Sequence, residues 1–183
     1  MSKKLKIFAM MLTCILLSIN QVWGATATYT WTFSSGDQWQ FSSNNASPGN
    51  NTGTATLNGV SWSYDRGTAV YLGTAQSSVH FGSSSGTENP TFTCSAFSSY
   101  TITGVSIKGS SYKGNHKVTI SVGGNVVKTA TSLPSPTSTP SAITTGTISK
   151  TGNVVISFSN GTRALYLQEI SITYETGSTY TLV

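Results

Sequence analysis

Acid–base or metal chemistry in this chain would depend on its carboxylates, and there are only five of them. They lie in different segments: Asp37, Asp65, Glu88, Glu169 and Glu175. Glycoside hydrolysis needs two carboxyl groups held at a set separation across the scissile bond. No local motif places any of the five opposite another, so the sequence does not predict a glycosidase.

Glu169 lies in the apolar and β-branched stretch NGTRALYLQEISITYE. Ile170 and Ile172 share one strand parity, whereas Leu165 and Leu167 share the other. A bulge beside Glu169 would turn both apolar pairs into the core, because one extra residue reverses the alternation of a strand. Glu169 is therefore predicted to be a solvent-facing residue at the rim of a sheet.

The sequence supports nucleophilic catalysis and metal binding no better than it supports glycoside hydrolysis. There is no G-x-S-x-G, His80 and His116 have no recognisable nucleophile partner, and His80 is predicted to be an outward polar residue of a strand. Cys94 alternates with apolar neighbours, which predicts a buried thiol. Loops at Asp37 and Asp65 could hold a structural calcium ion, but neither has the carboxylate density of a dedicated site. We therefore predict no catalytic residue, no cofactor and no enzyme.

Aromatic side chains with polar neighbours are the better lead to a function. Trp39 lies in GDQWQFSSNN and Tyr64 in SYDRG. Sugar rings present apolar C–H faces that stack on exposed aromatic rings, while polar side chains bond their hydroxyls. The candidate ligand-binding residues are Trp39, Tyr64, Asp65, Arg66 and Asp37. The alternative for the two aromatic residues is packing in a core.

Apolar and polar residues alternate with a period of two along most of the chain. Tyr29–Phe33, Trp39–Phe41, Val118–Val122 and Val154–Phe158 each have the pattern of a strand with one buried face. Trp31 belongs to the core on this pattern. No stretch predicts a helix longer than one turn.

Turn residues agree with the strand pattern. Asn58-Gly59 and Gly123-Gly124 each lie between two strand-like segments and predict tight hairpins. Gly104 interrupts an alternation and predicts a bulge. About eleven short strands at regular spacing indicate an all-β chain, an antiparallel β-sandwich of the jelly-roll kind.

The two ends of the chain differ from its middle. Residues 1–24 combine basic residues with an apolar run and small residues, the pattern of a signal peptide, with cleavage after Gly24 or after Ala27. Residues 25–176 are predicted to form one β-sandwich module. Residues 177–183 have the composition of a linker or of the start of a further domain.

A proline-rich stretch, LPSPTSTPS at residues 133–141, interrupts the module. We interpret it as a long loop and not as a domain boundary. The strands predicted after it, including Ile143–Ile148, are too few to form a stable unit alone.

The charge of the chain does not predict a nucleic-acid surface. Ten Lys and Arg stand against five Asp and Glu. Removal of Lys3, Lys4 and Lys6 with the leader leaves seven basic residues and a net charge of +2. These are scattered, whereas phosphate binding needs a cluster. The one basic grouping, the segment 113–117 with His116, is interpreted as a solvated turn.

Three stretches together resemble a known kind of module: TYTWTFSSGDQW, SYTITGVSIKGSSYKGNHKVTISVGG and GNVVISFSNGTRALYLQEISITYE. Their strand pattern resembles that of secreted bacterial jelly-roll modules of the galactose-binding-like and carbohydrate-binding-module type. The resemblance implies an antiparallel sandwich with a ligand site in loops at one end or on a concave sheet face. It assigns no ligand residue to a position of this chain.

The leading hypothesis is a non-catalytic, exported binding module for carbohydrate that works beside another domain. The alternative is a structural or adhesive β-sandwich that mediates protein–protein contacts at the cell surface. A carbohydrate or cell-surface ligand is the expected partner, with no nucleic acid and no membrane span. Periplasmic, cell-surface and extracellular locations all agree with the predicted signal peptide.

Overall fold

The computed structural model describes residues 24–34, 36–42, 47–136 and 142–177. Residues 26–176 form one compact unit. Residues 1–23 of the predicted leader, residues 137–141 of the proline-rich loop and residues 178–183 lie outside the described residues, so the predictions made for them stay predictions.

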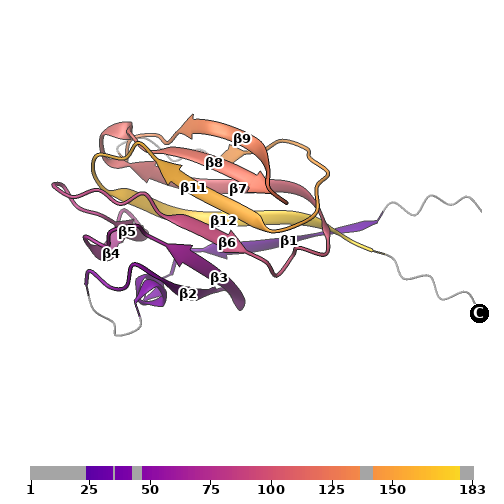
Figure 1. Ribbon diagram of the computed structural model, residues 1–183, viewed down its shortest axis with the longest axis horizontal. Helices are drawn as coiled ribbons and strands as arrows, with labels where there is room; N and C mark the ends of the chain where they lie inside the picture. Colours follow the sequence, from indigo (N-terminus) through magenta and orange to yellow (C-terminus); the bar gives the residue numbers. More distant parts are fainter. Residues whose placement is uncertain (1–23, 35, 43–46, 137–141, 178–183) are drawn as a thin grey trace, which may run out of the picture. The chain divides into compact units, whose positions relative to one another are not determined.

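The described part of the chain consists of β-strands and two short 3-10 helices (Figure 1). The strands are β1 (Ala25–Thr32), β2 (Thr52–Leu57), β3 (Val60–Asp65), β4 (Leu72–Ala75), β5 (Ser78–Phe81), β6 (Thr91–Cys94), β7 (Thr101–Ser111), β8 (Lys117–Val122), β9 (Asn125–Ser132), β10 (Ile143–Thr144), β11 (Val154–Ser159) and β12 (Leu165–Thr176). The 3-10 helices are η1 (Asp37–Phe41) and η2 (Tyr112–Gly114).

The strands form two antiparallel sheets, which overlie each other in the view of Figure 1. Sheet A has the order β10-β7-β12-β5-β4, with β1 also paired to β12, and sheet B has the order β2-β3-β6-β11-β8-β9. From β3 onward the chain crosses repeatedly between the sheets, which is how a jelly roll is wound. The predicted all-β antiparallel sandwich is confirmed.

The predicted turns and bulges hold these strands in register. Asn58-Gly59 joins β2 to β3 and Gly123-Gly124 joins β8 to β9, all four residues with positive φ as a tight hairpin requires. The register of β12 on β7 shifts between Leu167 and Glu169. The predicted bulge beside Glu169 is therefore confirmed, and it lets the apolar residues on both sides of it point inward.

The core lies between the sheets and contains large aromatic residues. Trp31 and Trp62 are buried, which confirms the core prediction for Trp31. Phe41 lies edge-on to Phe81 and Phe92, with ring centroids 5.0 and 5.7 Å apart. Each such side chain contributes on the order of 2–3 kcal/mol when fully buried. Cys94 is buried among them, as predicted.

Two local predictions were wrong. Trp39–Phe41 is part of η1 and not of a strand, because the backbone N–H groups of Asp37, Trp39 and Ser42 donate to carbonyls three residues back. The Asp37 carboxylate also accepts a hydrogen bond from the backbone N–H of Ser34, and such local bonds compete with strand pairing. The sequence predicted a strand over Ile143–Ile148, but only Ile143–Thr144 is a strand.

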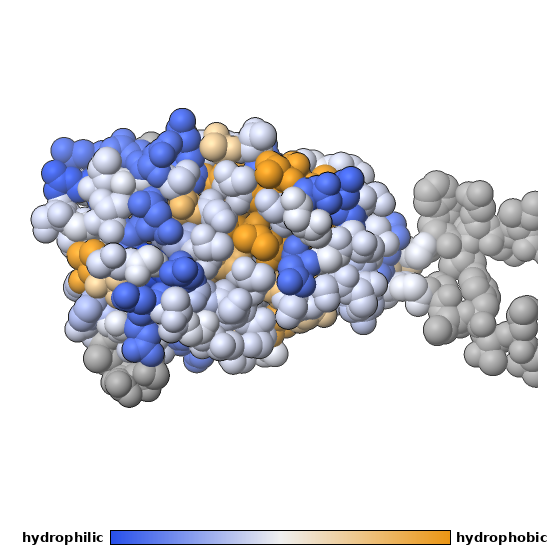
Figure 2. Space-filling view, in the orientation of Figure 1, coloured by the Kyte–Doolittle hydropathy of each residue, from blue (hydrophilic) through white to orange (hydrophobic). Residues whose placement is uncertain are grey.

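The outward residues of sheet B are mostly Thr and Ser, as in the cross-strand row of Thr54, Ser63 and Thr93. Figure 2 shows a face on which pale and blue residues dominate, with small orange areas between them. No helix in the described ranges is both long and apolar enough to cross a membrane.

Candidate functional site

The five residues proposed from the sequence do not meet in one site. Trp39 and Tyr64 line one surface depression together. Asp37 lines a different one with Trp31. Asp65 is exposed, whereas Arg66 is completely buried and has no surface for a ligand to contact. A ligand role for these residues stays a prediction, and it would require more than one site.

The tryptophan depression is lined by Trp39, Gln40, Ser42, Asn50, Gly53, Thr54 and Tyr64 and measures about 280 Å³. Trp39 is only partly buried, but it packs against the core. Tyr64 is 5% exposed and its ring lies edge-on to Phe41 at 5.4 Å. So little of Tyr64 is exposed that it offers a sugar no free ring face.

Asp37 and Asp65 hold their own loops. The Asp37 carboxylate accepts hydrogen bonds from Trp31 Nε1 at 3.0 Å and from the Ser34 backbone N–H at 2.7 Å. Asp65 accepts from the Gly67 backbone N–H at 2.7 Å. Across the described ranges, no group of three or more His, Cys, Asp or Glu is placed to hold a metal ion.

Arg66 forms a bidentate ion pair with Glu88, and both side chains are buried. Arg66 Nε donates to Glu88 Oε2 at 2.6 Å, and Nη2 donates to Oε1 at 2.7 Å. The pair also fixes the main chain around Tyr71. Glu88 accepts from the backbone N–H groups of Val70 and Tyr71, and Arg66 donates to the Tyr71 carbonyl at 2.9 Å. A charged pair in a core needs such additional hydrogen bonds to offset its desolvation.

His116 extends this buried network, so the prediction that it lies in a solvated turn was wrong. His116 Nε2 is 2.9 Å from the Glu88 carbonyl, which can only accept, so Nε2 carries the proton. Its Nδ1 then accepts from the Ser111 hydroxyl at 2.7 Å. Burial lowers the pKa of His116, in agreement with a neutral ring. The chain turns inward here because Ser111 and Glu88 supply partners that solvent would otherwise supply.

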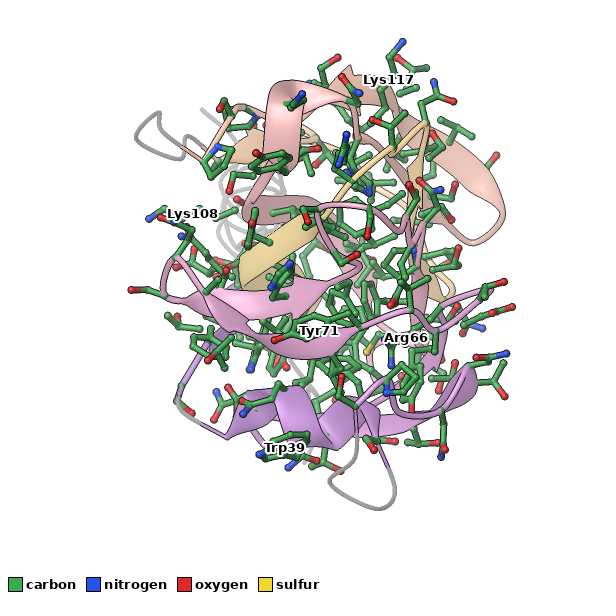
Figure 3. All side chains as sticks on the ribbon, turned by 90° about the vertical axis from the view of Figure 1, so that its left-hand side faces the viewer. Trp39, Arg66, Tyr71, Lys108 and Lys117 are labelled. Carbon is green, nitrogen blue, oxygen red and sulfur yellow. The ribbon has the colours of Figure 1, made fainter. Side chains whose placement is uncertain are left out.

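A third depression, the aromatic pocket, includes Tyr71, whose backbone this network holds. It is lined by Tyr71, His80, Ser83, Ser84, Tyr112, Ala164 and Tyr166 and measures about 320 Å³. Figure 3 shows Tyr71 well apart from Trp39, which belongs to η1. The aromatic pocket and the tryptophan depression are therefore separate surfaces.

Cross-strand pairing builds the floor of the aromatic pocket. Gly73 on β4 pairs with His80 on β5, His80 pairs with Tyr166 on β12, and Tyr166 pairs with Ser110 on β7. The chain neighbours of His80 and Tyr166 point into the core, so these two side chains lie on the outer face of sheet A, where surrounding groups leave 8% of Tyr166 exposed. The imidazole of His80 stacks on the Tyr166 ring, with centroids 4.7 Å apart and planes at 29°.

Two exposed tyrosines form the walls. Tyr71 is 40% exposed and Tyr112 is 39% exposed. The Tyr71 ring lies over Gly73, since a Cβ added to Gly73 would come within 2.7 Å of the Tyr71 hydroxyl. The centroids of the Tyr71 and His80 rings are 5.0 Å apart. Tyr112 follows Ser111, and its backbone N–H donates to the Ala164 carbonyl. The buried network thus binds the main chain at one wall, where Glu88 accepts from the Tyr71 N–H, and the Ser111 side chain next to the other wall, where His116 contacts its hydroxyl.

The lining of the aromatic pocket is uncharged near neutral pH. Burial lowers the pKa of His80 and raises the pKa of Tyr166, so the imidazole and the phenol are both neutral. No carboxylate is among the lining residues. A pocket with aromatic walls, hydroxyl groups and no acid–base pair can bind a polar molecule that has an apolar face.

Sequence reasoning named neither His80 nor Tyr166 as part of a site. The signal was present, because His80 lies between Val79 and Phe81, and Tyr166 lies between Leu165 and Leu167. Both were therefore on the outward parity of their strands. What the parity could not supply was the order of the sheet, which places β5 beside β12.

Comparisons with known proteins do not assign a family. No protein-family model matches the chain, and no curated protein matches it. Among solved structures, it is similar to the crystal structure of a GH26-CBM35 β-(1,4)-mannanase from Podospora anserina, with a TM-score of 0.38 and 15% sequence identity. The match covers 85% of this chain and 29% of the mannanase chain, so this chain spans less than a third of that protein. A likeness of this size carries no argument about function.

Proposed function

We propose that the chain is a non-catalytic carbohydrate-binding module and that its ligand binds in the aromatic pocket. One observation supports this more than any other: two half-exposed tyrosines, Tyr71 and Tyr112, line the same depression as the stacked rings of His80 and Tyr166. Exposed aromatic rings in a concave site offer the stacking surfaces that the C–H faces of a sugar need.

The remaining lining residues fit the polar side of a sugar. Ser83 and Ser84 supply hydroxyl groups at the edge, and each tyrosine adds a phenolic hydroxyl. The volume of about 320 Å³ lies at the small end of the range for small-molecule sites, roughly 300–1,000 Å³. A short segment of a glycan is the ligand that we expect. Export through the predicted signal peptide and action beside a further domain are part of the same proposal.

The alternative function, protein–protein adhesion, has one observation in its favour. Strand β9 lies at the edge of sheet B, spans eight residues and carries Val126, which is 57% exposed. Free edge strands can accept a strand from a partner. However, β9 carries Lys128 and its pairing with β8 is irregular. Charges and irregular pairing are features by which edges avoid such addition, so we favour the aromatic pocket.

A glycan screen of the full chain tests the proposal. The purified protein would be applied to a glycan array and to insoluble polysaccharides, beside the variants Tyr71→Ala and Tyr112→Ala. The matched control is Tyr100→Ala, because Tyr100 is 38% exposed but contacts Tyr174 and does not line the pocket.

We expect each of the two pocket variants to lose about fivefold in affinity, since one stacked ring contributes on the order of 1 kcal/mol. The control should bind like the wild-type protein. Equal losses in all three variants, or no binding to any glycan, would contradict the proposal, and the second result would favour the adhesive alternative.

A further inference from the structure

His80 is the polar centre of the aromatic pocket. It lies in the middle of the cross-strand row formed by Gly73, His80, Tyr166 and Ser110. Its ring contacts Tyr71 on one side and Tyr166 on the other, at 5.0 and 4.7 Å between centroids. His80 Nε2 is shielded from solvent and has no hydrogen-bond partner in the described part of the chain. The row therefore holds an imidazole that lines a concave site and has a buried Nε2 that no group in the described part of the chain satisfies.

The groups that face His80 supply no free negative charge. Strand β4 presents Gly73, which has no side chain, and β12 presents the neutral phenol of Tyr166. Tyr71 and Tyr112 form the walls. Glu88, the acid whose charge influences His80, is bound to Arg66 by two hydrogen bonds.

Two cations, Lys113 and Arg163, are chain neighbours of the lining residues Tyr112 and Ala164. Apart from the smaller Coulombic influence of Glu88, an imidazolium at His80 would have only aromatic rings and solvent to stabilise it.

We propose, building on the proposed function, that His80 is the polar contact of the aromatic pocket for an uncharged sugar and that protonation of His80 releases the sugar. A neutral imidazole can donate a hydrogen bond to a sugar hydroxyl from one ring nitrogen or accept one at the other. An imidazolium covered by a neutral sugar loses hydration and gains no counter-charge. Proton binding and sugar binding therefore oppose each other, and by linkage each weakens the other to the same extent.

The environment of His80 in the free protein favours the neutral imidazole. Burial is the main reason that the pKa of His80 is lowered from 6.5, and the Coulombic influence of Glu88 acts in the opposite direction and is smaller. A sugar that covers the pocket removes more solvent from the ring, so it lowers this pKa further. The affinity for an uncharged sugar should thus be constant above pH 6.5 and fall on the acid side of it.

Isothermal titration calorimetry at pH 7.5 and pH 5.0 tests this inference on the full chain. The probes are cellohexaose, mannohexaose and xylohexaose, all uncharged, with trigalacturonic acid as the charged comparison. For an uncharged probe that binds, the wild-type affinity should be lower at pH 5.0 than at pH 7.5. Trigalacturonic acid should show no such fall, because its carboxylates pair with an imidazolium.

Two substitutions separate the polar and the titrating roles of His80. His80→Gln keeps hydrogen-bonding groups but does not titrate, so it should bind at both pH values with one affinity. His80→Phe keeps a ring and loses the polar contact, so it should bind more weakly at pH 7.5.

NMR titration of the wild-type imidazole signals adds a readout that needs no variant. The uncharged probe should lower the pKa of His80 and leave that of His116 in place.

The possible results are distinguishable. A wild-type affinity that is equal at both pH values, or an acid loss that persists in His80→Gln, would overturn this inference and leave the proposed function intact. If none of the probes binds at either pH, both the proposed function and this inference are contradicted for these sugars.

Discussion

The aromatic pocket and the tryptophan depression contain similar residue types but differ in how their rings are placed. Tyr71 is 40% exposed and lies over Gly73, on the outward side of sheet A. Tyr64 is 5% exposed and lies over Gly53, with Phe41 against its ring. Each tyrosine thus covers a cross-strand or neighbouring glycine, yet only Tyr71 keeps a surface free for a ligand. Polar neighbours in the sequence therefore do not show that an aromatic ring is exposed.

The largest loss of stability is expected from breaking the buried Arg66–Glu88 ion pair, which holds the main chain at Tyr71 in the aromatic pocket. Arg66→Met leaves the Glu88 carboxylate buried without its charged partner, which should cost about 3–5 kcal/mol of the free energy of unfolding. Urea denaturation would measure this cost. Lys128→Met on β9 is the control and should change stability by less than about 0.5 kcal/mol. A cost below about 1 kcal/mol for Arg66→Met would show that the pair does not hold the Tyr71 segment.

Alanine substitution of the two tyrosines should separate the regions by stability. Tyr64→Ala removes a buried ring and should cost about 3 kcal/mol, since core aromatic truncations lie near that value. Tyr71→Ala removes a half-exposed ring and should cost about 0.5 kcal/mol. Thermal and urea denaturation of both variants would measure the difference. Equal costs would mean that Tyr71 is a packing residue and not a surface for a ligand.

Gly73 and Gly53 allow the two tyrosines to be displaced without being removed. A Cβ at position 73 would come within 2.7 Å of the Tyr71 hydroxyl, and a Cβ at position 53 within 2.6 Å of the Tyr64 hydroxyl. Gly73→Ala should push the exposed Tyr71 ring aside and lower glycan affinity by roughly threefold, with little change in stability. Gly53→Ala should cost about 1–2 kcal/mol because Tyr64 is packed against the core.

Calorimetry and urea denaturation of this glycine pair would check both effects. The reverse outcome, with binding lost in Gly53→Ala, would transfer the site to the tryptophan depression.

The smallest of the expected changes is the change of stability with pH. Burial lowers the pKa of His80 and of His116 from 6.5. Between the lowered values and 6.5 the unfolded chain binds more protons than the folded chain, so stability should be constant above pH 6.5 and should fall below it. Urea midpoints between pH 7.5 and pH 5.5 would show this. His80→Gln should make the fall shallower, and a rise in stability on acidification would contradict the assignment of neutral rings.

Turn residues and strand alternation in the sequence predicted most of the fold. The hairpins at Asn58-Gly59 and Gly123-Gly124 and the bulge beside Glu169 were all readable, because turn residues and strand parity act over a few positions. The β4–β5 hairpin was not, since its turn residues Gln76 and Ser77 adopt positive φ without a glycine. Helix η1 was also missed, because its hydrogen bonds do not follow from apolar alternation.

The site was less predictable because it depends on long-range pairing. Arg66 and Glu88 are 22 residues apart in sequence, and nothing near either one indicates its partner. The floor of the aromatic pocket needs β5 to lie beside β12, which strand patterns alone do not give. Arg66 was singled out as a polar neighbour of Tyr64 that could bond a sugar hydroxyl, but its observed hydrogen bonds go to Glu88 and to backbone carbonyls, one of them that of Tyr71.

The most direct test of the account is a map of where a glycan binds. Backbone amide NMR spectra of the full chain would be recorded during titration with mannohexaose, cellohexaose and xylohexaose in turn. Shifts that cluster at Tyr71, His80, Tyr112 and Tyr166 are the predicted result. Shifts confined to the surroundings of Trp39 and Tyr64, or no shifts with any of the three, would contradict the claim that the aromatic pocket is a carbohydrate site.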